Sequence, residues 1–127
     1  MAKPTGARPP GGRRGSSKYV PDAGQLVWLS FSPQAGREQA GRRPALVLSP
    51  LAYNARTGLC VVCPVTGRAK GYPFEVALPA ALPVQGVILS DHVKSADWHA
   101  RDAQHIAAVP EEILAQVRAK LGPLLGT

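Results

Sequence analysis

Short runs of strand-forming residues alternate with turn-forming residues along most of the chain, and this pattern limits the available folds more than any other feature. The runs cover residues 25–31, 45–49, 59–65, 74–78 and 86–90. Proline and glycine separate them, for example at Pro50, Gly58 and Gly71. Several short strands spaced about ten residues apart with such punctuation are typical of a small β-barrel.

The C-terminal segment has a helical pattern instead. Ile113, Val117 and Leu121 repeat every four residues, which places them on one face of a helix. Pro110 suits the first helical position, and the two acidic residues after it favour the positively charged helix start. We expect a packing helix from Pro110 to Leu121, ending at the Gly-Pro pair that follows. The fold class expected is mainly β with α.

The chain is long enough for one domain, since 127 residues with 45% apolar content can build one core. Residues 1–18 are rich in glycine, proline, serine and arginine, so we expect a disordered basic tail before a domain at 19–127. No run approaches the roughly 18 apolar residues of a membrane span, and no apolar segment follows the basic N-terminus. We therefore expect a cytoplasmic protein that contacts no membrane.

The cysteines and histidines give no sign of a metal site. Cys60 and Cys63 are separated by an odd number of positions, so in a strand they point to opposite faces, and we expect them neither to pair nor to hold a metal. Half of a zinc or redox site is the alternative for a Cys-x-x-Cys motif, but no second ligand pair follows. His92, His99 and His105 form no cluster with them and are interpreted as surface or core-edge residues. We expect neither a metal nor a cofactor.

Positive charge is concentrated in two segments. The net charge is +7, and residues 1–18 carry five positive charges and no acidic residue. Residues 37–70 hold six basic residues against one acidic residue. Such a distribution suits a surface that binds phosphate, although a solvated basic surface would have the same composition.

The most informative motif lies in the second basic segment, where Glu38 and Arg43 flank Gly41 just before the apolar run 45–48. Glycine permits a sharp turn, and Pro44 restricts Arg43 to extended geometry. A guanidinium whose direction is set in this way suits a phosphate group.

Together with other segments, this motif resembles the MazF/PemK-type toxin endoribonucleases. The resemblance runs from Tyr19 to about Leu125. It is carried by Tyr19-Val20-Pro21-Asp22, Glu38-Gln39-x-Gly41-x-Arg43-Pro44, Leu48-Ser49-Pro50, Tyr53-Asn54, Thr66, Lys70-Gly71-Tyr72-Pro73-Phe74-Glu75-Val76, Asp91, Val93-Lys94-Ser95 and Trp98. It implies an SH3-like barrel, a homodimer and metal-independent cleavage of single-stranded RNA.

The resemblance also implies roles for four residues in a cleavage reaction that begins with attack by the RNA 2′-hydroxyl. Arg43 would stabilise charge on the phosphorane, and Thr66 would orient the substrate and donate a hydrogen bond. Glu38 would position Arg43, with a general-base role second, although a surface ion pair with Arg43 remains open. Asp91 is a candidate base, and capping the turn after a strand is its alternative.

Residues expected to bind RNA surround this motif and the strand end at Thr66. Tyr72 or Phe74 could stack on a base. The polar and basic candidates are Gln39, Arg42, Asn54, Arg56, Arg68 and Lys70.

Two other functions remain open from the sequence. A non-enzymatic toxin of the same fold acting on DNA gyrase would carry a tryptophan at its extreme C-terminus, whereas this chain ends Leu124-Leu125-Gly126-Thr127. A nucleic-acid-binding barrel without catalysis is the other alternative. For a ribonuclease toxin we expect an acidic antitoxin partner, because the basic side chains that hold phosphate would also hold carboxylates. We also expect a homodimer, because the apolar helix face and Trp28 present more apolar surface than one small core hides.

Overall fold

The computed structural model describes residues 19–31 and 41–127. The predicted tail at 1–18 and the candidate residues Glu38 and Gln39 lie outside these ranges. In chain order the elements are β1 (Gln25–Ser30), β2 (Arg42–Val47), α2 (Leu51–Thr57), β3 (Leu59–Thr66), β4 (Glu75–Ala77), β5 (Val87–Leu89), β6 (Lys94–Asp97), β7 (Gln104–Ala108) and α3 (Glu111–Leu125).

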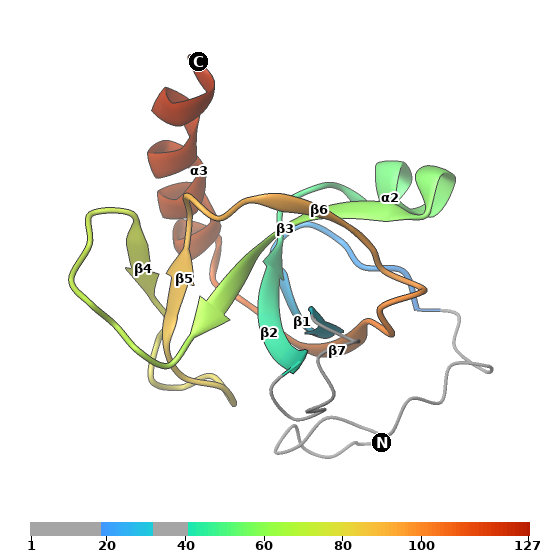
Figure 1. Cartoon of the computed structure of the whole chain (residues 1–127), viewed down its shortest axis with the longest axis horizontal. Coiled ribbons are helices and arrows are strands. Elements are labelled where there is room, and N and C mark those ends of the chain that lie inside the picture. Colours follow the sequence, from blue (N-terminus) through green and yellow to red (C-terminus); the bar gives the residue numbers. More distant parts are fainter. Residues whose placement is uncertain (1–18, 32–40) are drawn as a thin grey trace.

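All seven strands form one antiparallel sheet in the order β4-β5-β3-β2-β1-β7, with β6 paired to β3 off this path. Strand β3 connects the two halves, because its residues Leu59–Val62 pair with β6 while Val65 and Thr66 pair with β5. Figure 1 shows β4 and β5 on one side of β3 and β1, β2 and β7 on the other. The predicted fold class is confirmed, although within the described ranges the sheet does not close into a complete barrel.

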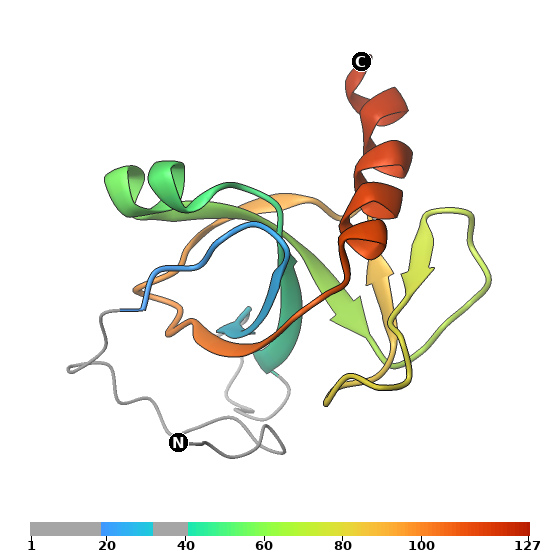
Figure 2. The same cartoon turned by 180° about the vertical axis from the view of Figure 1, so that it is seen from behind.

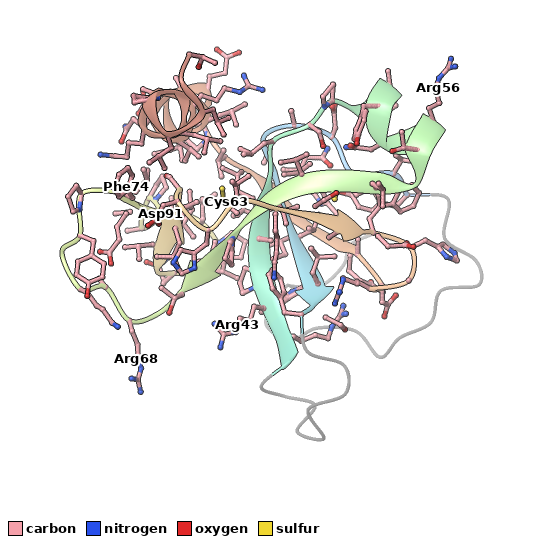
Figure 3. The ribbon with its side chains drawn as sticks, turned by 45° about the horizontal axis from the view of Figure 1, so that its top comes forward. Arg43, Arg56, Cys63, Arg68, Phe74 and Asp91 are labelled. Atoms are coloured by element: carbon pink, nitrogen blue, oxygen red, sulfur yellow. The ribbon has the colours of Figure 1, made fainter. Side chains whose placement is uncertain are left out.

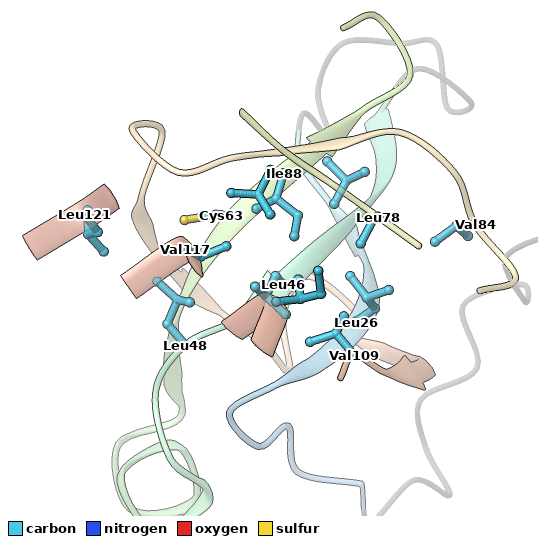
Figure 4. Close-up of a cluster of buried hydrophobic side chains, with 13 residues drawn as sticks. Leu26, Leu46, Leu48, Cys63, Leu78, Val84, Ile88, Val109, Val117 and Leu121 are labelled. Atoms are coloured by element: carbon cyan, nitrogen blue, oxygen red, sulfur yellow. The ribbon is translucent and has the colours of Figure 1, made fainter. Parts of the chain in front are cut away.

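Side chains on the two faces of the strands fill two separate cores. On β1 and β2, Leu26 and Leu46 point into the core beneath α3. Val27 and Val47 point into a second core, the barrel core, which also contains Cys60 and Ala96. Figure 4 shows the first core, in which Leu46 lies near Val117 of α3. This alternation with a period of two is the one expected of β-strands.

The cysteines of β3 follow the same alternation. Cys63 lies in the core beneath α3 and Cys60 in the barrel core, and both thiols are free. Their predicted placement on opposite faces is confirmed.

Helix α3 stands at the junction of the two halves of the sheet, as Figure 2 shows from behind. Ile113, Val117 and Leu121 are buried, which confirms the predicted packing face. The helix does not end at Gly122 but continues through Pro123 to Leu125, so the predicted end is wrong. Proline keeps a helical φ and lacks only one N–H, and the Gly126 N–H bonds the carbonyls of Gly122 and Pro123 to close the last turn.

Because the sheet of the same chain covers this apolar face, the face does not supply the reason for a dimer that the sequence suggested.

Four elements differ from the sequence prediction. Helix α2 and strands β6 and β7 were not predicted, and β2 begins at Arg42, three residues before the apolar run. Arg43 therefore lies inside a strand, where its direction is fixed by the sheet. No helix of the described part is long and apolar enough to cross a membrane.

Candidate active site

The register of β2 and β3 places Arg43 and Thr66 on the same face of the sheet. Ala45 pairs with Pro64 in this antiparallel ladder. Paired residues share a face of the sheet, and so do residues two apart on one strand. Arg43 lies two residues before Ala45 and Thr66 two residues after Pro64, so both side chains lie on the face that this pair occupies. The ladder ends at Ala45 and Pro64, since proline offers no N–H to continue it. The two candidate side chains lie just beyond this end.

A pocket of about 240 Å³ opens beside Thr66 on this face. Strands β4 and β5 extend the same face, because Thr66 pairs with Val87, and Leu89 pairs with Glu75. The lining residues are Thr66, Arg68, Lys70, Tyr72, Glu75, Leu89, Asp91 and His92. Four predicted site residues are thus brought together: Thr66, Arg68, Lys70 and Asp91.

The backbone around Thr66 is tightly held. Its Oγ1 accepts a hydrogen bond from the Arg68 N–H at 3.2 Å, which leaves the hydroxyl hydrogen available to donate to a ligand. Gly86, with φ of +132°, packs so closely that a Cβ there would lie 2.4 Å from the Thr66 carbonyl oxygen.

The loop between β3 and β4 is shaped by Glu75. The carboxylate accepts hydrogen bonds from the backbone N–H of Lys70 at 3.0 Å and of Gly71 at 2.9 Å. The Lys70 ammonium lies 5.9 Å from the centre of the Tyr72 ring, and Tyr72 is one of the most exposed large apolar side chains. Lys120 of α3 donates to the Pro73 carbonyl at 2.7 Å and ties this loop to the helix. The loop therefore presents the exposed side chains of Arg68, Lys70 and Tyr72 from a backbone that these hydrogen bonds hold in place.

Asp91 and His92 follow β5 and form the opposite rim of the pocket. The Asp91 Oδ1 lies 3.9 Å from the His92 Nε2, and the His92 backbone N–H donates to the Leu89 carbonyl at 3.0 Å. Both side chains are exposed, Asp91 at 38% and His92 at 59%. A substrate can therefore reach both groups.

Arg43 is exposed, and among the described residues its guanidinium has no hydrogen-bond or ion-pair partner. Figure 3 shows Arg43 and Arg68 projecting from the lower part of the view, with Arg56 at the opposite, upper end. Arg43 is thus an exposed cation, unpaired with any residue of 19–31 or 41–127, on the face that carries the pocket.

Arg42 is turned inward. Its guanidinium donates to the Ser30 Oγ at 3.0 Å and to the Asp102 carbonyl at 3.0 Å, and it lies 3.8 Å from the Asp102 carboxylate. Burial lowers the pKa of Arg42, and the charge of Asp102 partly opposes this. The side chain joins β1, β2 and the segment before β7, so the geometry favours a structural role over the predicted RNA contact.

Asn54 and Arg56 lie on α2, away from the pocket. Asn54 is fully buried, and its amide donates to the carbonyls of Pro21 and Ser49 at 2.8 and 2.9 Å. Its side chain holds α2 against the chain, so we do not include it in the proposed site. Arg56 is exposed at the far end of the molecule.

The thiol nearest the pocket is inert. Burial, followed by the charge of Asp91, raises the pKa of Cys63 to about 12, and its Sγ donates to the Ser90 carbonyl at 3.7 Å. No group of three or more His, Cys, Asp or Glu side chains within 19–31 and 41–127 is placed to hold a metal ion.

Sequence reasoning missed Glu75 and His92 as pocket residues. Glu75 lies within a matching segment but was assigned no role, and His92 was interpreted as a surface residue. The signal that could have found His92 is its position next to Asp91, a candidate base at a strand end.

Comparison with known proteins identifies the family. The description "PemK-like, MazF-like toxin of type II toxin-antitoxin system" matches residues 22–125. The endoribonuclease toxin MazF of Escherichia coli strain K12 is 50% identical over 110 residues, which are 87% of this chain and 98% of that protein. The endoribonuclease PemK of Escherichia coli is 35% identical over 108 residues, 82% of this chain and 81% of that protein.

Solved structures agree. MazF from Deinococcus radiodurans superimposes with a TM-score of 0.80 and 66% identity, covering 87% of this chain and all (100%) of that one. MazF in a MazE-MazF structure from the same organism gives a TM-score of 0.78 and 61% identity, covering 87% and 99%. Since the family match at 22–125 includes both halves of the sheet, the pocket and α3, this chain belongs to the PemK-like, MazF-like toxins of type II toxin-antitoxin systems.

Proposed function

We propose that this chain is an endoribonuclease toxin that cuts single-stranded RNA at the face carrying Arg43 and the pocket. One observation carries the proposal most strongly: Arg43, Thr66 and the pocket share one face of the sheet, with Arg68 and Lys70 beside them. The names of the MazF and PemK relatives support the RNA-cleaving activity. An exposed face that combines several cations with an aromatic ring suits an RNA strand.

The reaction proposed is attack of the RNA 2′-hydroxyl on the adjacent phosphorus. The Arg43 guanidinium would bind the phosphate oxygens as negative charge develops on them. The Thr66 hydroxyl would donate a hydrogen bond to one of these oxygens. Asp91 is the candidate to accept the 2′-hydroxyl proton, and Glu38 would support Arg43 from outside the described residues. Because these groups supply charge stabilisation and hydrogen bonds directly, we propose that no metal is needed.

Recognition of RNA would involve the β3–β4 loop. Arg68 and Lys70 are exposed beside Tyr72, so phosphate and base contacts can form on neighbouring side chains. Gln39 remains a proposed contact outside the described ranges. Arg56 would contact RNA only if the strand extended to the far end of the molecule.

We further propose that the toxin is a homodimer that an acidic antitoxin inhibits. MazF of Deinococcus radiodurans has been solved together with MazE, which supports an antitoxin partner here. The cations that would hold phosphate would also hold carboxylates, so such a partner would compete directly with RNA.

The test is incubation of the purified protein with a long single-stranded RNA in excess EDTA, followed by analysis of the new ends. We expect 2′,3′-cyclic phosphate and 5′-hydroxyl ends. A requirement for added magnesium would contradict the mechanism, and intact RNA under all conditions would favour the gyrase or non-catalytic alternatives.

Arg43→Ala should reduce the cleavage rate by about 100- to 1,000-fold, the scale seen when one oxyanion-stabilising donor is removed. Arg118→Ala is the matched control, since Arg118 is an arginine of α3 that lines no part of the pocket. Near-normal cleavage by a folded Arg43→Ala protein would show that Arg43 does not act on the phosphate.

A further inference from the structure

We propose that His92 is a catalytic residue that protonates the 5′-oxygen as it leaves the phosphorus, an inference that rests on the RNA-cleaving function proposed above. His92 lines the same pocket as Thr66 and is 59% exposed, so its imidazole can reach a bound phosphodiester. The hydrogen bond from its backbone N–H to the Leu89 carbonyl fixes the turn that presents it.

Chemistry singles out the imidazole among the groups that line the pocket. Guanidinium, ammonium and phenol groups hold their protons near neutral pH, and carboxylates have released theirs. An imidazole both gains and loses a proton in this range. His92 is the one histidine among the lining residues, so it is the pocket group best able to donate a proton and then recover it.

The neighbours of His92 suit this role. Asp91 is close enough, at 3.9 Å, to form an ion pair with a protonated imidazole, but too far for a hydrogen bond that would occupy the Nε2 proton. The Glu75 carboxylate is occupied by the backbone of the β3–β4 loop. Among the residues that the structure describes, the remaining charged or titratable groups that line the pocket with His92 are Arg68, Lys70 and Tyr72.

The step balances without any further reactant. The 2′-oxygen forms a bond to phosphorus while the bond from phosphorus to the 5′-oxygen breaks. The 2′-hydroxyl proton passes to Asp91, and the leaving 5′-oxygen takes a proton from His92. Transfer of the proton from Asp91 to the adjacent His92, directly or through water, restores both groups, and the products are a 2′,3′-cyclic phosphate and a 5′-hydroxyl.

The test compares two RNA oligonucleotides that contain one cleavage site mapped with the wild-type protein. One has the ordinary linkage, and the other has sulfur in place of the bridging 5′-oxygen. Sulfur leaves as a thiolate and needs no proton from an acid. Single-turnover rates are measured across pH for wild type, His92→Gln and the matched control His99→Gln, whose exposed histidine lies outside the pocket.

We expect His92→Gln to lower the rate on the ordinary linkage by about 100- to 10,000-fold, the range for loss of a general acid. The same variant should cut the sulfur linkage nearly as fast as wild type. His99→Gln should match wild type on both linkages. Unchanged melting temperatures would show that both variants are folded.

An equal loss on both linkages, or no loss on either, would overturn the role of His92 while leaving the RNA-cleaving function intact. A wild-type protein that cuts neither linkage would overturn the proposed function itself, so the two failures are distinguishable.

Discussion

Replacing Gly86 with alanine should displace Thr66 and remove cleavage activity together with stability. A Cβ at Gly86 would lie 2.4 Å from the carbonyl oxygen and 3.0 Å from the carbonyl carbon of Thr66, and 3.3 Å from a methyl group of Val65. The first two contacts are with backbone, which cannot rotate away. The Gly86 carbonyl also accepts a hydrogen bond from the Leu78 N–H at 2.9 Å, so Gly86 cannot move without breaking it.

Two effects set the size of the loss. Forcing extra volume into a packed site costs about 1–3 kcal/mol, and a backbone conformation that only glycine adopts readily adds about 1–3 kcal/mol. The free energy of unfolding should therefore fall by about 2–6 kcal/mol, a large part of the roughly 5–15 kcal/mol of an ordinary domain. Cleavage should fall further than the folded fraction does, because the Thr66 hydroxyl moves with its backbone.

The loop between β3 and β4 offers two control positions. An alanine Cβ at Gly67 meets nothing within 4 Å, so Gly67→Ala should leave stability unchanged or slightly raised. Gly71 has equally open surroundings but a φ of +81°, so Gly71→Ala should show the backbone penalty alone. Urea denaturation and RNA cleavage are measured for all three variants. A Gly86→Ala protein as stable and as active as Gly67→Ala would refute the reasoning.

Three further predictions can be tested on the same protein. Deleting residues 1–18 should leave the melting temperature nearly unchanged and weaken RNA binding in a salt-dependent way. Filter binding at rising salt would measure the loss of RNA binding. A large loss of stability would mean that this segment joins the fold. Burial, followed by the charge of Asp97, raises the pKa of Cys60 from 9.0 to about 11. Burial, followed by the charge of Asp91, raises the pKa of Cys63 from 9.0 to about 12. The contribution of these neutral thiols to the free energy of unfolding should be complete below pH 9.0 and should fall as pH rises towards 11 and 12. Urea denaturation at each pH would measure this fall. Rapid alkylation of the native protein at pH 8 would contradict the burial of the thiols. Light scattering should give a homodimer, and a monomer would count against the proposed dimer. An Asp- and Glu-rich antitoxin segment should displace RNA less well as salt rises. Inhibition that leaves RNA bound would count against direct competition between the antitoxin and RNA.

The fold could be predicted where local pattern and burial agree. Alternation and punctuation located β1, β3, β4 and β5 to within a residue or two and the start of α3 to within one. Strand β6 escaped prediction because Ala96 is its only buried residue, so no alternating apolar pattern marks it. Helix α2 escaped because its one buried residue is Asn54, which is polar and leaves no apolar stripe.

The site was only partly visible for a related reason. Arg43 and Thr66 could be named because their local motifs resemble a known family. Their common face depends on the ladder between β2 and β3, and the place of His92 in the pocket depends on the pairing of β5 with β3. Register between strands far apart in sequence is a tertiary property, so residue types alone could not bring His92 and Thr66 together.

Strand β3 contributes to both cores, through Cys60 and Val62 on one face and Cys63 and Val65 on the other, and it ends at Thr66. Because releasing β3 would open both cores at once, its central amide protons should exchange with solvent only when the whole domain unfolds. Thr66 is therefore not removed by local opening of the protein. With Thr66 in the role proposed above, cleavage activity would last for as long as the domain stays folded, and an inhibitor would act by occupying the pocket.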